Sequence, residues 1–129
     1  MVARASLLKR RKFSEPADAK HHVLLDLHED LPLFRYFLDT RSAKEVWQFR
    51  EMQCLGAIAA LRARALEGAG VCVLPLYFVR EDLAARRLLR VLPATKLPSD
   101  WFRLVWRAGH AREVELQGLA GELSELPLR

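Results

Sequence analysis

Short apolar segments alternate with amphipathic segments along this chain, and the connections between them are brief. Residues 67–93, EGAGVCVLPLYFVREDLAARRLLRVLP, hold the pattern in its smallest form: a helix closed by glycine, a short apolar strand, a proline, a second helix and another strand. Strands that are separated by helices are typical of βαβ units. The sequence therefore predicts an α/β fold with a largely parallel or mixed sheet.

The periods of apolar residues divide the chain into elements. The last helix is expected to turn its apolar residues inward, toward a core. These inward residues are Leu116, Leu119, Ala120 and Leu123. Helices are expected at residues 5–11, 14–20, 32–39, 57–68, 76–87 and 114–126, and strands at residues 23–27, 46–52, 71–74, 88–92 and 101–106. The turn-rich joints are expected around Pro75 and residues 92–98.

The size and composition of the chain limit its class. A chain of 129 residues with 51% hydrophobic residues can bury one compact core, and it is too apolar to be disordered. No apolar run approaches the roughly 20 residues that a membrane-spanning helix needs. The charges at residues 9–12 follow the first apolar stretch instead of preceding it, which is the wrong order for a secretory signal. We therefore expect a cytoplasmic protein without a membrane partner.

The two cysteines, Cys54 and Cys72, are placed by the sequence in apolar surroundings, one at the end of a strand and one inside a strand. Such cysteines suit a reduced intracellular protein better than a disulfide scaffold. We interpret both as small hydrophobic residues, with redox sensing as the alternative.

The sequence favours neither a metal site nor a catalytic site. The histidines and acids between residues 21 and 30 lack a second ligand set at a defined spacing. They are His21, His22, His28, Glu29 and Asp30. No serine lies in a nucleophile-elbow pattern, and Gly68 and Gly70 end a helix instead of opening one, which argues against a phosphate loop. We expect no enzyme, no metal and no cofactor.

The net charge of +5 and the pI of about 9.7 raise the question of nucleic-acid binding. Most arginines are spread over several elements and mixed with acids, as on a solvated surface. These are Arg62, Arg64, Arg86, Arg87, Arg90, Arg103, Arg107 and Arg112. The compact cluster at residues 9–12, KRRK, is the one candidate for nonspecific contact with nucleic acid.

Four segments, taken in order, resemble the effector-binding domain of LysR-type transcriptional regulators. They are residues 47–70, then VCVLP at 71–75, LLRVLP at 88–93 and FRLV at 102–105. The recurrent pattern of this family is a strand, a helix that begins at glycine, and then the motif G-x-G-x-x-x-L-P. A helix, a strand with the motif G-x-L-x-x-V-L-P, and a closing strand and helix follow. The resemblance covers nearly the whole chain, and residues 1–8 resemble the start of the second lobe.

This resemblance implies a periplasmic-binding-protein-like fold of type 2, in which two α/β lobes are joined by two crossing strands and hold a small effector between them. It implies that residues 1–74 form the second lobe, residues 75–92 the hinge and crossing segment, and residues 93–129 the returning part of an incomplete first lobe. The implied hinge residues are Leu74, Pro75, Leu92 and Pro93.

The sequence also departs from the family pattern. The helix-turn-helix, the linker helix and the first half of the first lobe have no counterpart in it, so any contact with DNA would be indirect. Arg87 stands where the family usually has glycine, before the second hinge strand.

The resemblance places Leu55, Gly56, Ala57 and Ile58 where a strand end meets a helix N-terminus that faces the cleft. Free backbone N–H groups at such a point can hold a carboxylate or a similar anion. Tyr77, just after the hinge proline, could reach the same cleft with its hydroxyl. The plainer alternatives are that Gly56 only opens the helix, that Ile58 packs in the core, and that Tyr77 is a half-buried tyrosine.

Two functions remain open. The first is the effector-sensing module of a LysR-type regulator, which binds a small-molecule effector, expected to be an anion, and contributes to a homodimer. The second is a stand-alone, truncated interaction protein that pairs with itself or with a full-length LysR-type partner through an exposed sheet edge. A solute-binding protein of a transporter would share the fold but is disfavoured, because the export signal that it needs is not found.

Overall fold

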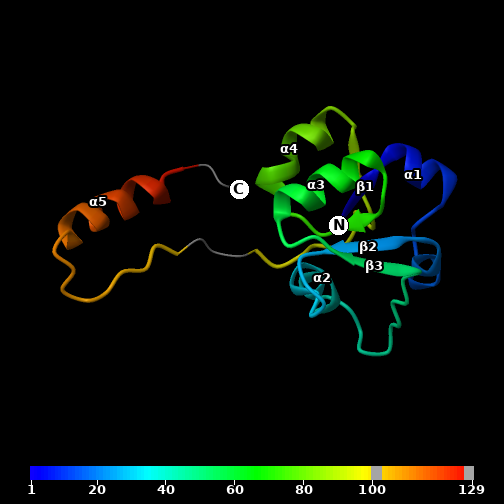
Figure 1. The fold of residues 1–129 in the computed structure, drawn as a ribbon, viewed down its shortest axis with the longest axis horizontal. Helices are drawn as coiled ribbons and strands as arrows, with labels where there is room; N and C mark the ends of the chain where they lie inside the picture. The colour runs from blue at the N-terminus through cyan, green and yellow to red at the C-terminus, as the bar shows by residue number, and fades with distance from the viewer. Residues whose placement is uncertain (100–102, 127–129) are drawn as a thin grey trace. The chain divides into compact units, whose positions relative to one another are not determined.

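The computed structural model describes residues 1–99 and 103–126, which fall into two compact units, Met1–Pro98 and Ser99–Arg129. The first unit holds all the strands of the described residues (Figure 1). Its elements are β1 (Val2–Arg4), α1 (Ala5–Arg10), the 3-10 helix η1 (Pro16–His21), β2 (Val23–Asp26), α2 (Pro32–Leu38), β3 (Glu51–Cys54), α3 (Ile58–Glu67), β4 (Val71–Cys72), α4 (Leu76–Ala84) and β5 (Leu88–Arg90). The second unit holds α5 (Glu113–Ser124).

The strands form one mixed sheet in the order β3-β2-β4-β1-β5. Strand β2 is parallel to both of its neighbours, with Leu24 opposite Met52 of β3 and Val71 of β4. Strand β1 is antiparallel to both β4 and β5, and Val2 lies opposite Cys72 and Arg90. Strands β2, β3, β4 and β5 therefore all run in one direction, and β1 runs against them. The predicted α/β fold with a mixed sheet is confirmed.

The alternation of side chains along the strands gives the sheet two apolar faces. Leu25 of β2 and Cys72 of β4 pack with Leu61 and Ala65 of α3 and with Val79 of α4 in one buried cluster. Figure 1 shows α3 and α2 on opposite sides of the sheet. Leu61 and Ala65, which lie on one face of α3, thus pack against the strand residues that point to the same side of the sheet. The sequence predicts this apolar face of the helix.

The opposite face is covered by α2 and a group of aromatic rings. Leu24 and Val71 pack in a second buried cluster with Phe34 and Phe37 of α2 and with Phe13. The rings of Phe34 and Phe37 lie 5.4 Å apart, centroid to centroid. Two buried faces explain why β2 is apolar almost throughout, because neither side of it meets solvent.

The predicted strand at residues 46–52 is wrong in its first part, since β3 begins only at Glu51. Trp47 and Phe49 do point the same way, but they pack on the aromatic group outside the sheet. The Trp47 ring lies 4.9 Å from that of Phe37, and the Phe49 ring lies 5.2 Å from that of Phe34. Burial of alternate rings produced the two-residue period here without a strand.

The helix and the strand that precede Pro93 are shorter than predicted. Helix α4 ends at Ala84 because Arg86 adopts a left-handed backbone with a φ of 56°. This conformation favours glycine, so the residue with a glycine-like backbone in this turn is Arg86, which directly precedes Arg87. Strand β5 ends at Arg90, and Leu92 has a φ of 52°.

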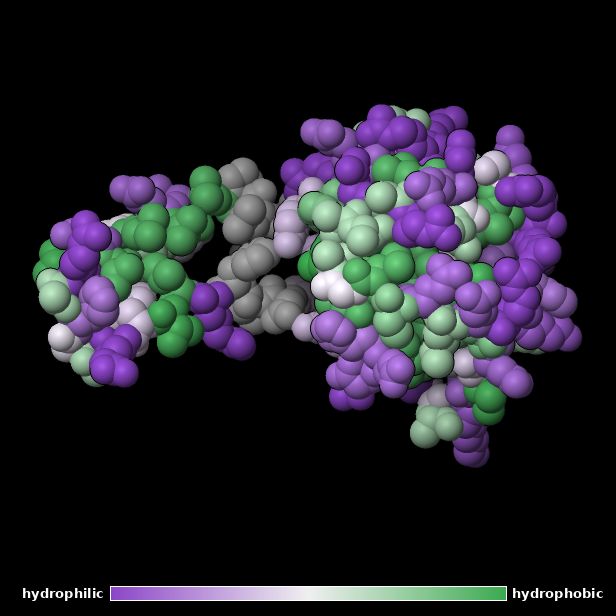
Figure 2. All heavy atoms as spheres, viewed as in Figure 1, coloured by the Kyte–Doolittle hydropathy of each residue, from purple (hydrophilic) through white to green (hydrophobic). Residues whose placement is uncertain are grey.

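Helix α5 confirms the predicted helix, but the prediction that its apolar residues turn inward is wrong. None of its residues is buried, and Leu119 and Leu123 are 43% and 40% exposed. Figure 2 shows apolar side chains on the surface of this unit. The reason is that the described part of the second unit offers no other element for α5 to pack on. The predicted strand at 101–106 lies partly outside the described residues, and residues 103–106 form no strand.

Two glycines fit α3 and β4 against the rest of the sheet. Gly68 ends α3 with a φ of 81°, and the N–H groups of Gly68 and Ala69 bond to carbonyls of the last helical turn. Gly70 lies so close to β2 that a Cβ atom there would be 2.5 Å from the carbonyl oxygen of Val23. This close approach allows β4 to pair with β2.

We predict that Gly70→Ala lowers the free energy of unfolding by about 1–3 kcal/mol, because the added methyl group must displace the backbone of β2. Gly118→Ala is the matched control, since a Cβ at Gly118 in α5 meets nothing within 4 Å. This control should leave stability unchanged or raise it, because alanine favours a helix more than glycine does. Urea denaturation followed by circular dichroism measures both changes, and equal stability of the Gly70→Ala variant and the parent would contradict the close approach.

Candidate functional site

Parallel strands end at one edge of a sheet, and in α/β folds this edge is where ligands bind. Here β2 ends at Asp26, β3 at Cys54 and β4 at Cys72, and helices α2, α3 and α4 begin shortly after these ends. We call this edge, with residues 26–27, 55–58 and 74–77, the carboxyl edge. It contains every candidate effector-binding residue that the sequence predicts.

The N-terminus of α2 is occupied by the carboxylate of Asp26. This side chain is 1% exposed and accepts hydrogen bonds from the backbone N–H groups of Leu27 (2.7 Å), Leu33 (3.2 Å) and Phe34 (2.8 Å). The carboxylate thereby satisfies helical N–H groups that would otherwise lack a partner, and it fixes α2 to the end of β2. Asp26 is not among the residues that the sequence predicts for the site. Its signal is a single acid in an otherwise apolar strand, followed by a helix that begins at Pro32.

The N-terminus of α3 is open. The N–H groups of Leu55 and Gly56 are used by the sheet, because they donate to the carbonyl oxygens of Asp26 (2.9 Å) and Leu27 (3.0 Å). Beyond them, no side chain caps α3, and the N–H groups of its first turn, from residue 58 to residue 60, have no acceptor among the described residues. Unpaired N–H groups at a helix N-terminus attract an anion.

The other predicted residues of the effector site lie around this point. Gly56 and Ala57 are exposed, and Gly56 has a φ of 69°. Ile58 and Leu55 are half-buried and pack against the buried cluster under α3. Ile58 therefore does pack against the core, as the plainer alternative for this residue predicts. Tyr77, at the start of α4, is 40% exposed.

The four predicted hinge residues also gather at the carboxyl edge. Leu74 is buried after β4, and Pro75 directly precedes α4. Leu92 and Pro93 follow β5, which runs in the same direction as β4 because both are antiparallel to β1. Both pairs therefore leave the sheet at the same edge, which is the arrangement that two crossing segments require.

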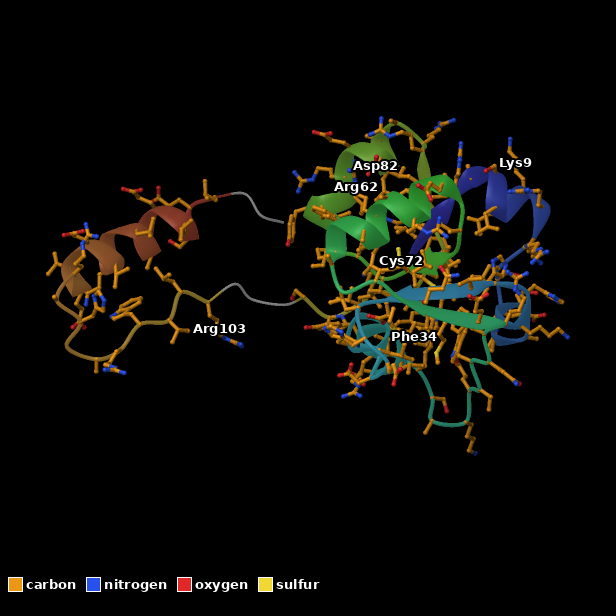
Figure 3. All side chains as sticks on the ribbon, viewed as in Figure 1. Lys9, Phe34, Arg62, Cys72, Asp82 and Arg103 are labelled. Atoms are coloured by element: carbon orange, nitrogen blue, oxygen red, sulfur yellow. The ribbon has the colours of Figure 1, made fainter. Side chains whose placement is uncertain are left out.

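A buried ion pair joins α3 to α4. The carboxylate of Asp82 is fully buried, and it accepts bonds from Nε of Arg62 at 2.6 Å and from Nε of Arg87 at 2.8 Å. Figure 3 shows Asp82 and Arg62 close together between the two helices. Burial alone would raise the pKa of Asp82, but its bonds to the two guanidinium groups hold the pKa below its usual value. The side chains of Arg62 and Arg87 are still 34% and 51% exposed, as expected of a solvated surface, but each also binds the buried Asp82.

The cysteines differ from each other in the structure. Cys72 is buried in the sheet, and burial raises the pKa of its thiol to about 12, so the reactive thiolate is suppressed. Cys54 is exposed, which departs from the apolar surroundings expected of it.

The histidines and acids between residues 21 and 30 separate in the fold. His22 is buried and stacks on Phe13 with ring centroids 4.8 Å apart, whereas His21 and His28 are exposed. Within the described residues, no three His, Cys, Asp or Glu side chains are grouped as a metal ion would need.

The geometry defines a class of protein: an α/β lobe of the periplasmic-binding-protein-like fold, with an open helix N-terminus at the carboxyl edge of its sheet. The sequence matches the LysR substrate binding domain over residues 1–126. The chain therefore belongs to the LysR substrate-binding domain family, whose members are transcription regulators and not enzymes. A comparison with curated proteins finds no match.

Solved structures share the fold. The regulatory domain of a HypT variant from Salmonella typhimurium is 20% identical with a TM-score of 0.65, and the match covers 97% of this chain and 63% of that one. Full-length HypT, described as a hypochlorite-specific LysR-type transcriptional regulator, is 18% identical with a TM-score of 0.62, at 97% and 43% coverage. The C-terminal domains of a LysR family protein from Agrobacterium tumefaciens are 23% identical with a TM-score of 0.60, at 73% and 45% coverage.

The chain thus spans between 43% and 63% of the length of these three proteins.

Throughout the described residues, each helix is too short or too polar to cross a lipid bilayer.

We predict that Asp82→Asn lowers the free energy of unfolding at neutral pH by about 1–3 kcal/mol, because it leaves two guanidinium groups without their buried counter-charge. The folded-state pKa of Asp82 lies below the unfolded-state value, so the unfolded chain holds the proton more tightly and acid favours unfolding. The stability that Asp82 contributes is therefore complete above about pH 4, the usual carboxyl value, and is lost as the pH falls through the lowered pKa.

Denaturation in urea at neutral pH and at a series of acidic pH values measures this difference. Asp30→Asn is the control, because Asp30 is exposed and forms no ion pair within the described part of the chain. Its stability should stay within about 0.5 kcal/mol of the parent. A gap between Asp82→Asn and the parent that stays constant into strong acid would contradict the role of the Asp82 charge.

Proposed function

We propose that this chain is the effector-sensing module of a LysR-type transcriptional regulator, and that it binds a small anionic effector at the carboxyl edge. It acts by binding and not by catalysis. One observation carries the proposal: the first turn of α3 presents unpaired N–H groups at the edge where ligands bind in α/β folds. The effector site we propose comprises Leu55, Gly56, Ala57, Ile58 and Tyr77.

The contrast between α2 and α3 supports an anion at α3. Both helices begin at the same edge, but the N-terminus of α2 already holds the carboxylate of Asp26. An effector carboxylate at α3 would take the equivalent position, with the N–H groups of Ile58, Ala59 and Ala60 as donors. The exposed Gly56 leaves the approach open, since even a Cβ atom there would meet nothing within 4 Å.

We propose that residues 1–74 form the second lobe, residues 75–92 the hinge and crossing segment, and residues 93–129 the returning part of the first lobe. Leu74, Pro75, Leu92 and Pro93 would serve as the hinge, because both pairs leave the sheet at the carboxyl edge. An effector at this edge would touch the hinge region directly. Its binding could then change the arrangement of the lobes and, in a dimer, the position of a DNA-reading element elsewhere.

A second function is favoured by the exposed apolar side chains. Val105 and Val114 are each 82% exposed, and Met52 on the edge strand β3 is 54% exposed. Apolar surface and an unpaired strand edge both favour association. In this alternative, the chain pairs with itself or with a full-length LysR-type partner. Size-exclusion chromatography with light scattering over a range of concentrations separates the two, because an interaction protein must associate.

We predict that Ala57→Asp blocks anion binding at α3. Residue 57 is the N-cap of α3, and an aspartate there would accept the free N–H groups with its own carboxylate. It should raise the free energy of unfolding by about 0.5–2 kcal/mol. It should also weaken the binding of small carboxylates by at least about tenfold, because the donors are occupied and the added charge repels an anion.

Thermal denaturation with a panel of carboxylates from acetate to benzoate measures both effects. At least one carboxylate should raise the melting temperature of the parent and not that of Ala57→Asp. Ala63→Asp is the matched control, because Ala63 is exposed on the same helix beyond its first turn, and it should keep the response. If Ala57→Asp responds to carboxylates as the parent does, the effector site is not at α3.

A further inference from the structure

A concave site lies away from the carboxyl edge. It is an open recess of about 490 Å³, within the range of small-molecule sites. Three parts of the first unit form it: the junction of β1 and α1, the last turn of α3, and the turn after α4. The lining residues are Arg4, Ala5, Ser6, Lys9, Leu66, Arg86 and Arg87.

The strand directions put this recess at the opposite edge of the sheet from the proposed effector site. Arg4 ends β1 and lies opposite Leu88, the first residue of β5. Because β5 runs with the parallel strands, its first residue marks their amino ends, whereas Leu55 and Pro75 follow carboxyl ends. We therefore call it the amino-edge recess, and a ligand bound there would not occupy the effector site.

The charges in the amino-edge recess are all positive. Four of its lining residues are arginine or lysine and none is acidic. Within the described residues, Arg4, Lys9 and Arg86 form no ion pair with any carboxylate. Figure 3 shows Lys9 projecting from α1. A site with several unpaired cations in a concave surface attracts an anion.

Two acids whose partners include or adjoin lining residues, Asp82 and Glu67, are already occupied. Asp82 is buried and shared between Arg62 and Arg87. The carboxylate of Glu67 is bound by Arg64 at 2.6 Å, and Arg4 reaches only the backbone carbonyl of Glu67, at 3.4 Å. The positive charge of the recess is therefore left for a ligand to neutralise.

The recess also has apolar walls. Leu66 and Ala5 line it, and Leu66 is partly buried against the core. The aliphatic stem of Arg4 lies over Gly68, where a Cβ atom would be 3.3 Å from Cδ of Arg4, so the lack of a side chain at Gly68 makes room for it. Arg86 has a left-handed backbone, a conformation that glycine adopts more readily than arginine does. The side chain of Arg86 adds a cation to the rim.

We propose that the amino-edge recess binds a small organic anion that carries a doubly charged group, such as a phosphate ester, on an apolar body. The doubly charged group would be held by Lys9, Arg86 and Arg4, and the apolar body would cover Leu66 and Ala5. The apolar walls distinguish this ligand from a nucleic-acid backbone, which would use the cations alone. This inference does not depend on the effector site at α3.

Isothermal titration calorimetry of the full chain with phenyl phosphate tests the proposal. Phenyl phosphate should bind, and inorganic phosphate should bind at least about tenfold more weakly, because it lacks a ring to bury. Lys9→Gln and Arg86→Gln should each weaken phenyl phosphate by about fivefold to tenfold, since each removes a charged donor from a half-open site. Both side chains are exposed, so these variants should fold like the parent.

Lys44→Gln is the matched control, because it makes the same change in net charge at an exposed residue outside the recess. Its affinity should stay within about twofold of the parent. The proposal is overturned if phenyl phosphate does not bind, if all three variants weaken it equally, or if neither Lys9→Gln nor Arg86→Gln does. If inorganic phosphate binds as tightly as phenyl phosphate, the proposal that the ligand has an apolar body is overturned. A short DNA duplex that binds more tightly and displaces phenyl phosphate would instead identify a nucleic-acid surface.

Discussion

The buried carboxylate of Asp26 fixes the end of β2 to the start of α2, and the geometry of the carboxyl edge depends on it. Its hydrogen bonds to Leu33 and Phe34 hold α2 in place, and α2 in turn carries Phe34 and Phe37 into the aromatic cluster on one face of the sheet. The backbone carbonyl of the same residue receives the N–H of Leu55 and so aligns the end of β3. Asp26 therefore occupies the N-terminus of α2 with its carboxylate and positions the N-terminus of α3 with its carbonyl. The N-terminus of α3 stays open.

The two edges of the sheet differ in chemistry. The carboxyl edge offers backbone N–H groups at α3, beside the residues that we propose as the hinge. It also contains the buried carboxylate of Asp26, which accepts backbone N–H bonds at the start of α2. The amino edge offers the side-chain cations of Arg4, Lys9 and Arg86 around apolar walls. Backbone donors suit a carboxylate that must fit one geometry, whereas flexible cations suit a more highly charged group. If both proposals hold, this chain has two anion sites that do not compete.

The sequence predicted the fold class well, because the periods of two and 3.6 residues are set by burial on the two faces of the sheet. It placed α3 within a residue of its observed ends, since Gly68 and the spacing of Leu61 and Ala65 are local signals. It failed at residues 46–50, where alternate rings are partly buried outside the sheet. It also failed at α5, where the apolar spacing is present but the described structure offers nothing to cover it. Periodicity reports which residues favour burial, and not what they are buried against.

The polar residues were harder to predict. Asp26 and Asp82 are buried acids whose partners lie on other elements, at Leu33 and Phe34 for one and at Arg62 and Arg87 for the other. Such pairs depend on the tertiary fold, and the one local signal is at Asp26, a single acid in an otherwise apolar strand that precedes the helix beginning at Pro32. The candidate effector residues came from the family resemblance, and the structure added the distinction between N–H groups used by the sheet and those left unpaired at α3.

The most direct test of this account is to follow the backbone amide NMR signals of the chain during titration with benzoate. If an anion binds at the open N-terminus of α3, the largest changes should fall on the amides of Ile58, Ala59 and Ala60, with smaller ones at Gly56 and Ala57. The amides of Leu33 and Phe34 should hardly change, because Asp26 already occupies them. Largest changes far from α3, or none along α3 at saturation, would contradict the central claim.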